Sequence, residues 1–249
     1  MRQSSSIFLT AEWRSLAMLN YEVDPRLLRP LVPSGTELDN WHGKTFVSLV
    51  GFLFLNTKVF GVPIPFHRNF EEVNLRFYVR RREGNELRRG VVFVREIVPR
   101  WAIATVARKV YGEKYVSMPM SHQIRARADG GAAVEYAWRL GKNWNKLSLT
   151  AAGEPALPAE GSEEQFITEH YWGYAAQPTG GSVEYRVTHP SWRVWRAQRA
   201  QFEGEMEELY GRELAATIKQ RPASAFLAEG SEIAVLRGHA LTAARTATQ

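Results

Sequence analysis

Polar and apolar side chains alternate strictly in one short stretch of the sequence, from residue 72 to residue 79. The polar positions are Glu72, Asn74, Arg76 and Tyr78, and the apolar ones are Val73, Leu75, Phe77 and Val79. Successive side chains of a β-strand point to opposite faces, so the polar set shares one face and the apolar set faces the core. A carboxylate, an amide and a guanidinium on one face can transfer protons and bind an anion or a carbonyl group.

Two simpler interpretations of this polar face stay open. Antiparallel sheets commonly have one face in water, so the set can be an exposed surface. Glu72 and Arg76 can also form a buried ion pair that only stabilises the fold. Asn74 favours a pocket, because asparagine is depleted in strands and gains little there unless its amide has a partner.

Other common catalytic patterns are missing from the sequence. The histidines are His42, His67, His122, His170, His189 and His239, and none has a metal-ligand spacing. There is no nucleophile elbow, phosphate-binding glycine loop or dinucleotide fingerprint. We therefore expect neither a metal nor a cofactor. His189 precedes Pro190 and is a candidate ligand-binding residue, although a turn histidine is the simpler interpretation.

The composition is that of one globular domain spanning residues 1–249. The chain is 45% hydrophobic and contains no cysteine, which excludes disulfides and thiolate metal sites. The apolar run at the N-terminus is too short for a secretory signal, and no later run approaches a membrane span. We expect a cytoplasmic protein without membrane contact, and homo-oligomerisation stays open.

Arginines dominate the basic side of a formal net charge of +6. Arg80–Arg82 and Arg88–Arg89 flank a predicted turn at residues 83–86, so they gather at a hairpin tip that nucleic acid or an acidic partner could contact. No nucleic-acid-binding motif accompanies them, and charged tips also protect sheet edges. We therefore expect no nucleic-acid partner.

Local signals place further elements around the polar strand. Asp24 and Pro25 begin a short helix, Gly51 bends a buried strand at 45–55, and Ser162 has the capping-box spacing to Gln165. The remaining predictions are strands at 91–98, 133–140, 182–187, 192–195 and 231–237, a loop at 151–161, and helices at 99–112, 162–174 and 202–219. Many strands with few helices predict an α+β barrel or sandwich.

Three stretches resemble the acetoacetate decarboxylase-like superfamily. They are Trp13–Leu16 with Tyr21–Pro33, then Phe70–Glu72, and finally Ala107–Gly112. The resemblance implies that Arg14 is an active-site arginine and that Glu72 is the catalytic carboxylate. It also implies a lysine that forms a Schiff base, shortly after the glycine.

A closer resemblance is to the functionally uncharacterised YqjF-like family within that superfamily. It is carried by Glu72–Arg76, Phe166–Tyr171 and His189–Trp192, and it covers residues 8–195, leaving the region from about residue 196 outside it. It implies a mostly antiparallel, closed β-barrel with flanking helices and a polar lumen.

The lysine pattern departs from that of the decarboxylases. Counted from Gly112, the lysine pair falls at Tyr115 and Val116, and the nearest lysine is Lys114. An offset of one residue reverses the face of a strand that a side chain occupies, unless a bulge corrects it. Lys114 is therefore either a pocket lysine or a solvated one, and Tyr115 can place a phenol in the lumen.

Together these observations predict a small anionic or oxo-acid ligand in a barrel lumen. The candidate catalytic residues are Glu72, Lys114 and Tyr115, and the candidate ligand-binding residues are Arg14, Asn74, Arg76 and His189. The two functional classes left open are an acid/base or lyase-like enzyme without a Schiff-base lysine and a non-catalytic small-molecule-binding protein.

Overall fold

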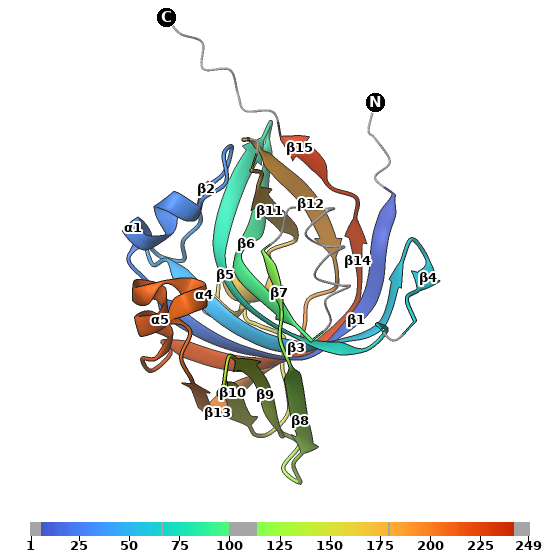
Figure 1. Cartoon of the computed structure of the whole chain (residues 1–249), viewed down its shortest axis with the longest axis vertical. Coiled ribbons are helices and arrows are strands. Elements are labelled where there is room, and N and C mark those ends of the chain that lie inside the picture. Colours follow the sequence, from blue (N-terminus) through green and yellow to red (C-terminus); the bar gives the residue numbers. More distant parts are fainter. Residues whose placement is uncertain (1–5, 66, 100–113, 179, 242–249) are drawn as a thin grey trace, which may run out of the picture.

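The computed structural model of the chain describes residues 6–65, 67–99, 114–178 and 180–241. The helix predicted at 99–112, which includes Lys109, lies outside these ranges except for Pro99. The described part consists mostly of β-strands, as the sequence predicts (Figure 1).

The pairings of the long strands run in a ring. In order around the ring the strands are β1 (Ile7–Glu22), β3 (Phe46–Val59), β5 (Phe70–Glu83), β6 (Glu86–Val98), β11 (Trp172–Ala176), β12 (Ser182–Thr188) and β14 (Ser224–Leu236). β14 pairs with both β12 and β1, which completes the ring. All neighbours are antiparallel except β6 and β11, which are parallel. The mostly antiparallel character is therefore confirmed.

A second antiparallel sheet extends below the ring in the view of Figure 1. It contains β8 (Met120–Ala126), β9 (Ala132–Leu140), β10 (Asn143–Ala151) and β13 (Val194–Glu203). The first residues of β13 pair with β14, so this strand joins the two sheets. Short strands extend the edges, namely β2 (Glu37–Leu38), β4 (Val62–Pro63), β7 (Tyr115–Ser117) and β15 (His239–Leu241).

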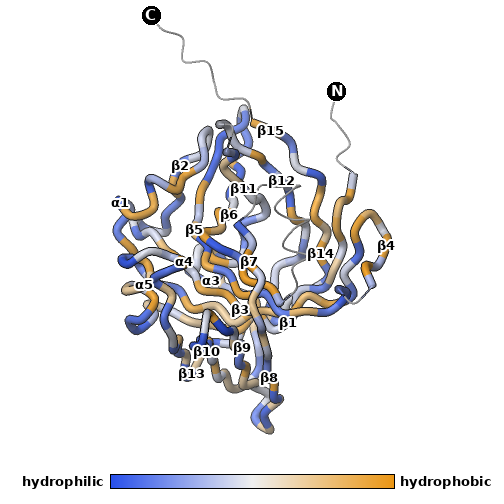
Figure 2. The backbone as a smooth tube through the Cα atoms, in the orientation of Figure 1, coloured by the Kyte–Doolittle hydropathy of each residue, from blue (hydrophilic) through white to orange (hydrophobic). Residues whose placement is uncertain are grey.

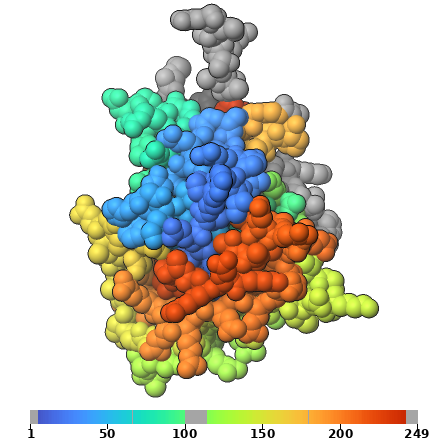
Figure 3. Space-filling model, turned by 90° about the vertical axis from the view of Figure 1, so that its left-hand side faces the viewer, coloured from blue at the N-terminus to red at the C-terminus, as the bar shows by residue number. Residues whose placement is uncertain are grey.

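The described helices are short. They are α1 (Pro25–Leu28), the 3₁₀ helix η1 (Arg29–Leu31), α3 (Glu163–Thr168), α4 (Glu207–Tyr210) and α5 (Arg212–Ile218). Asp24 caps α1 as predicted, accepting a hydrogen bond of 2.8 Å from the Arg26 amide. The first and last of these helices lie side by side on one face (Figure 3). None of the helices among the described residues has the length and apolarity needed to cross a membrane.

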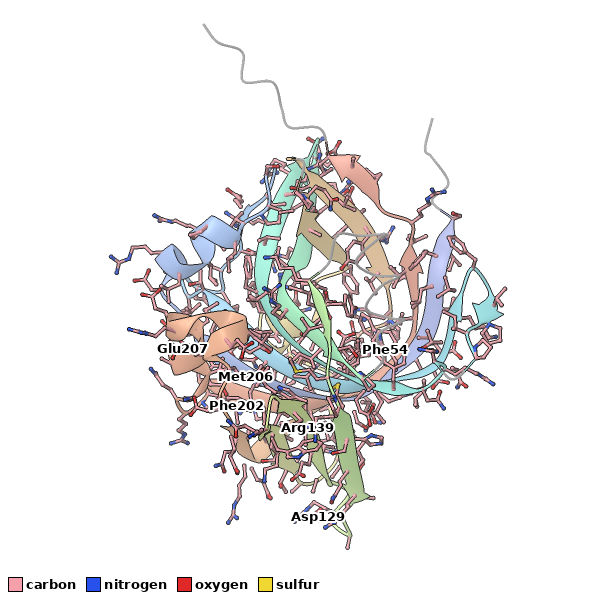
Figure 4. All side chains as sticks on the ribbon, in the orientation of Figure 1. Phe54, Asp129, Arg139, Phe202, Met206 and Glu207 are labelled. Atoms are coloured by element: carbon pink, nitrogen blue, oxygen red, sulfur yellow. The ribbon has the colours of Figure 1, made fainter. Side chains whose placement is uncertain are left out.

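The alternation on β5 separates two apolar clusters. The odd residues Val73, Leu75 and Phe77 pack with Tyr136 and Trp138 of the second sheet. The other cluster lies within the ring and includes Phe52, Phe54, Ile167 and Trp192. Figure 2 shows the apolar segments of β3 and β5, and Figure 4 places Phe54 at the ring and Phe202 and Met206 beside the second sheet. The even residues of β5 therefore face the interior of the ring rather than water.

The structure corrects several predicted element boundaries. The helix capped by Ser162 ends at Thr168, and Tyr174 lies on β11 instead. The region predicted as a helix at 202–219 begins as the end of β13, and Gly211, at φ 77°, separates α4 from α5. The last predicted strand begins earlier, at Ser224. Pairing with neighbouring strands decided these ends, since local propensity is a weak prior that tertiary context overrides.

Candidate functional site

A cavity of about 130 Å³ lies inside the ring. Most of its lining is apolar and aromatic, including Trp13, Phe52, Phe54, Phe70, Phe93 and Trp192. Its polar lining includes Glu72, Asn74, Arg76, Glu96, Tyr115, His170 and His189. A concave apolar site with a few convergent polar groups is the usual form of a small-molecule site.

Glu72 is the central polar group of the cavity. Its side chain is buried, with only 2% of the residue exposed. Asn74 Nδ2 donates to Glu72 Oε1 at 2.9 Å, and the Tyr115 hydroxyl donates to Oε2 at 3.3 Å. Burial raises the pKa of Glu72 to about 7, although these two hydrogen bonds and the charge of Arg76 act in the opposite direction. The carboxyl group can therefore take up or release a proton near neutral pH.

Tyr115 connects Glu72 to a second buried carboxylate, Glu96. β7 pairs in parallel with β6, so that Tyr115 lies next to Glu96. Burial raises the pKa of Tyr115 well above its ordinary value, and the charges of both carboxylates add to this effect. The phenol stays protonated and acts as a hydrogen-bond donor. Glu96 was not among the predicted site residues. It could have been recognised as the one carboxylate in the largely apolar segment 91–98.

Arg76 contributes a buried cation. Its Nη2 donates to the carbonyl oxygen of Ile167 at 3.3 Å and lies 3.8 Å from the sulfur of Met18. Its Nε has no hydrogen-bond partner, and no ion pair joins Arg76 to a carboxylate among the described residues. A buried guanidinium without a direct carboxylate partner is suited to a bound anion, because an unpaired buried charge is costly.

His170 is a further cavity residue that the sequence analysis did not assign to the site. Its side chain is 1% exposed, and its Nε2 lies 3.4 Å from Asp39 Oδ2. Burial lowers the pKa of His170, and this outweighs the opposing effect of Asp39. Burial alone would raise the pKa of Asp39, but His170 and Arg89 together lower it. The pair is therefore a neutral imidazole beside an ionised carboxylate.

His189 lies at the cavity as one of the predicted ligand-binding residues. Its ring stacks on Trp192 with centroids 4.1 Å apart. Its Nδ1 lies 2.9 Å from the carbonyl oxygen of Pro190, which can only accept, so Nδ1 carries the proton. Burial lowers the pKa of His189, so the ring is neutral at pH 7.

The structure does not bring Arg14 or Lys114 to the cavity lining. Arg14 is 40% exposed and pairs with Glu12 at 2.7 Å. The β1–β3 register shifts after Arg14, and Ser15 has φ 54°, so that Trp13 and Leu16 line the cavity instead. Lys114 is exposed just before β7, whereas Tyr115 lines the cavity. No lysine lines the cavity in the described part of the chain.

No group of three metal-ligating side chains gathers among the described residues. The cavity combines carboxyl groups, an amide, a guanidinium, a phenol and imidazoles with an apolar lining. These side chains can bind a small anion and can donate and accept protons.

Comparison with known proteins identifies the family. Residues 10–232 match the family DUF2071, described as an uncharacterized conserved protein. The uncharacterized protein YqjF of Bacillus subtilis (strain 168) is 27% identical over 196 residues, which cover 77% of this chain and 75% of YqjF.

Solved structures show the same fold at low sequence identity. Acetoacetate decarboxylase from Legionella pneumophila has a TM-score of 0.66 at 12% identity, covering 94% of this chain and 87% of that one. The enduracididine biosynthesis enzyme MppR complexed with pyruvate has a TM-score of 0.67 at 14% identity, covering 97% and 93%. The fold is acetoacetate decarboxylase-like, and the chain belongs to the DUF2071 family.

Proposed function

We propose that this protein binds a small oxo acid or related anion in the cavity and transforms it by proton transfer through Glu72, without a covalent lysine adduct. In this proposal the ring of strands acts as a closed barrel and the cavity is its lumen. The observation that carries the proposal is a buried carboxyl group with a pKa of about 7 in the same cavity as an arginine that has no carboxylate partner among the described residues.

Each polar group has a role that fits an oxo acid. Arg76 binds the carboxylate, and in the complex the Tyr115 hydroxyl turns its one proton from Glu72 to the carbonyl oxygen of the ligand. Glu72 takes a proton from the carbon next to that carbonyl, which leaves an enolate whose oxygen the phenol stabilises. The likeness to MppR complexed with pyruvate supports a ligand of this size and charge.

Exchange of carbon-bound hydrogen for deuterium tests this role of Glu72. A panel of small oxo acids is incubated in D₂O with the protein, and NMR follows the loss of the proton next to the carbonyl. We expect Glu72→Gln to slow exchange by roughly 10²–10⁴-fold, the usual contribution of a general base. Arg76→Met should instead weaken binding. Exchange at the wild-type rate in folded Glu72→Gln would remove Glu72 from the mechanism.

Borohydride trapping tests the absence of a lysine adduct. The protein is incubated with the same oxo acids and borohydride, and intact mass is compared between the wild type and Lys114→Ala. We expect no added mass at concentrations that stabilise the protein. A trapped adduct that disappears in Lys114→Ala would contradict the proposal and indicate a Schiff base on Lys114. An adduct that persists in Lys114→Ala would also contradict it and indicate a Schiff base on another lysine, such as Lys109.

The second candidate function is ligand binding without turnover. It is favoured by the apolar cavity lining and by the lack of a lysine there among the described residues. In this case an oxo acid at a free concentration of about 100 times its Kd raises the free energy of unfolding by about 2.7 kcal/mol. Neither hydrogen exchange at its carbon atoms nor a product is then observed.

A further inference from the structure

The Asp39–His170 pair gives the cavity a polar group that the proposed proton transfer does not use. His170 lies two residues beyond the end of α3 and lines the cavity, whereas Asp39 follows β2 and lies outside the lining. The imidazole packs against two neighbouring aromatic rings, with centroids 4.7 Å from Tyr78 and 4.9 Å from Phe166, and these two rings lie 5.3 Å from each other. Its position is therefore fixed by this aromatic cluster and by the nearby carboxylate.

The contact with Asp39 decides which ring nitrogen carries the proton. Nε2 lies 3.4 Å from the ionised carboxylate, which favours a proton on that nitrogen. A neutral imidazole has one proton only, so Nδ1 then holds a lone pair and can only accept a hydrogen bond. Both ring nitrogens are buried and neither makes a hydrogen bond among the described residues, but only Nε2 has a carboxylate oxygen within 4 Å.

Arg76 lies near His170, because its Nη2 donates to the carbonyl oxygen of Ile167, three residues before His170, and its guanidinium lies 5.8 Å from the Tyr78 ring against which His170 packs. Its positive charge disfavours protonation of the imidazole. The same region of the cavity thus offers a cation and, beside it, a hydrogen-bond acceptor. A ligand that satisfies both has a carboxylate next to a group that donates a hydrogen bond. A ketone oxygen at that place would face the lone pair of Nδ1, and this arrangement is repulsive.

We propose that His170, oriented by Asp39, is a specificity-determining residue that selects ligands with a hydroxyl group next to the carboxylate, as in 2-hydroxy acids or the enol form of 2-oxo acids. The ligand carboxylate binds Arg76 and the hydroxyl donates to His170 Nδ1. This inference rests on the proposed function, because it concerns the ligand of the same cavity.

Calorimetric titration with lactate and pyruvate tests the inference, since the two acids differ only in the hydroxyl and keto groups. We expect the wild type to bind lactate about tenfold more tightly, as expected from one buried hydrogen bond. His170→Phe keeps an aromatic ring of similar size and should abolish this preference. His122→Phe, the same change at a partly exposed histidine outside the cavity, should retain it.

A second variant keeps the test decisive if His170→Phe does not fold. Asp39→Ala removes the carboxylate beside Nε2, so that the proton is no longer favoured on that nitrogen. We expect the ¹⁵N shifts of His170 to report a loss of the preferred tautomer, and we expect the preference for lactate to be lost. An unchanged tautomer and preference in folded Asp39→Ala would overturn the orienting role of Asp39.

The outcomes separate this inference from the function on which it rests. Equal affinities, or tighter binding of pyruvate by the wild type, would overturn the selection by His170 and leave the proposed anion site intact. Failure of both acids to bind would overturn the proposed function and the inference together.

Discussion

Glu72 shows at the scale of a single residue how burial changes the chemistry of an ordinary carboxyl group. In water its pKa is near 4.5, and in the cavity burial raises the pKa to about 7. Asn74 and Tyr115 supply only partial compensation, since each donates one hydrogen bond. The result is a group that changes its protonation state within the physiological pH range.

This shift makes the stability of the fold depend on pH. Between pH 4.5 and 7 the unfolded chain has lost the Glu72 proton while the folded chain retains it, so the free energy of unfolding falls as the pH rises. The contribution is fully present below pH 4.5. We expect Glu72→Gln to lose this dependence and to gain roughly 2–3 kcal/mol relative to the wild type between pH 4.5 and 7.5, at about 1.4 kcal/mol per pKa unit.

Urea unfolding at several pH values measures this effect. Glu208→Gln, at an exposed carboxylate on α4, is the matched control and should follow the wild-type pH profile. A stability difference between Glu72→Gln and the wild type that stays constant from pH 5 to pH 8 would contradict the raised pKa.

At the scale of elements, β3 shows how closely the ring and the second sheet approach each other. A Cβ atom at Gly51 would lie 2.6 Å from Cδ2 of Tyr136, on β9. The glycine has its physical reason here, since the ring of Tyr136 occupies the space of a side chain. The Tyr136 hydroxyl also donates to the carbonyl oxygen of Ser15 at 2.8 Å, which ties β9 to β1.

We expect Gly51→Ala to destabilise the fold by about 1–3 kcal/mol, the usual effect of overpacking a core. The cost should fall in a Tyr136→Ala background, because the clash is then removed. A double-mutant cycle by denaturant unfolding measures the coupling between the two sites. Equal costs of Gly51→Ala in both backgrounds would show that the contact with Tyr136 is not the cause.

At the scale of the whole molecule, the ring is joined by side chains as well as by strand pairing. Glu184, on β12, is fully buried and accepts from Arg88 at 2.6 Å, Arg81 at 3.3 Å and the Tyr174 hydroxyl at 2.8 Å. The arginines of the β5–β6 hairpin therefore hold β12 against the tip of that hairpin. Both arginines therefore have a structural role at this site.

We expect Glu184→Gln to destabilise the fold by about 3 kcal/mol or more, because two arginines lose the buried carboxylate that they share. Glu86→Gln removes an exposed partner of Arg88 and should cost less than about 1 kcal/mol. Thermal unfolding of the two variants compares the sites, and hydrogen exchange of β11 and β12 should rise only in Glu184→Gln. Similar losses in both variants would contradict the special role of the buried carboxylate.

The sequence determined by itself those features that depend on near neighbours along the chain. Alternation on β5 predicted its two faces, and the cap at Asp24 predicted α1. These predictions succeeded because backbone geometry fixes them over two to four residues.

Only the tertiary structure decided which of the candidate residues meet. The positive φ of Ser15 and the register shift on β1 leave Arg14 outside the cavity, and parallel pairing of β7 with β6 brings Glu96 to Tyr115. His170 and Asp39 lie far apart in the sequence and meet because β2 pairs with β5, where the Asp39 amide donates to the Tyr78 carbonyl oxygen. Contacts of this kind depend on strand order and register across the whole ring, which no local pattern in the sequence encodes.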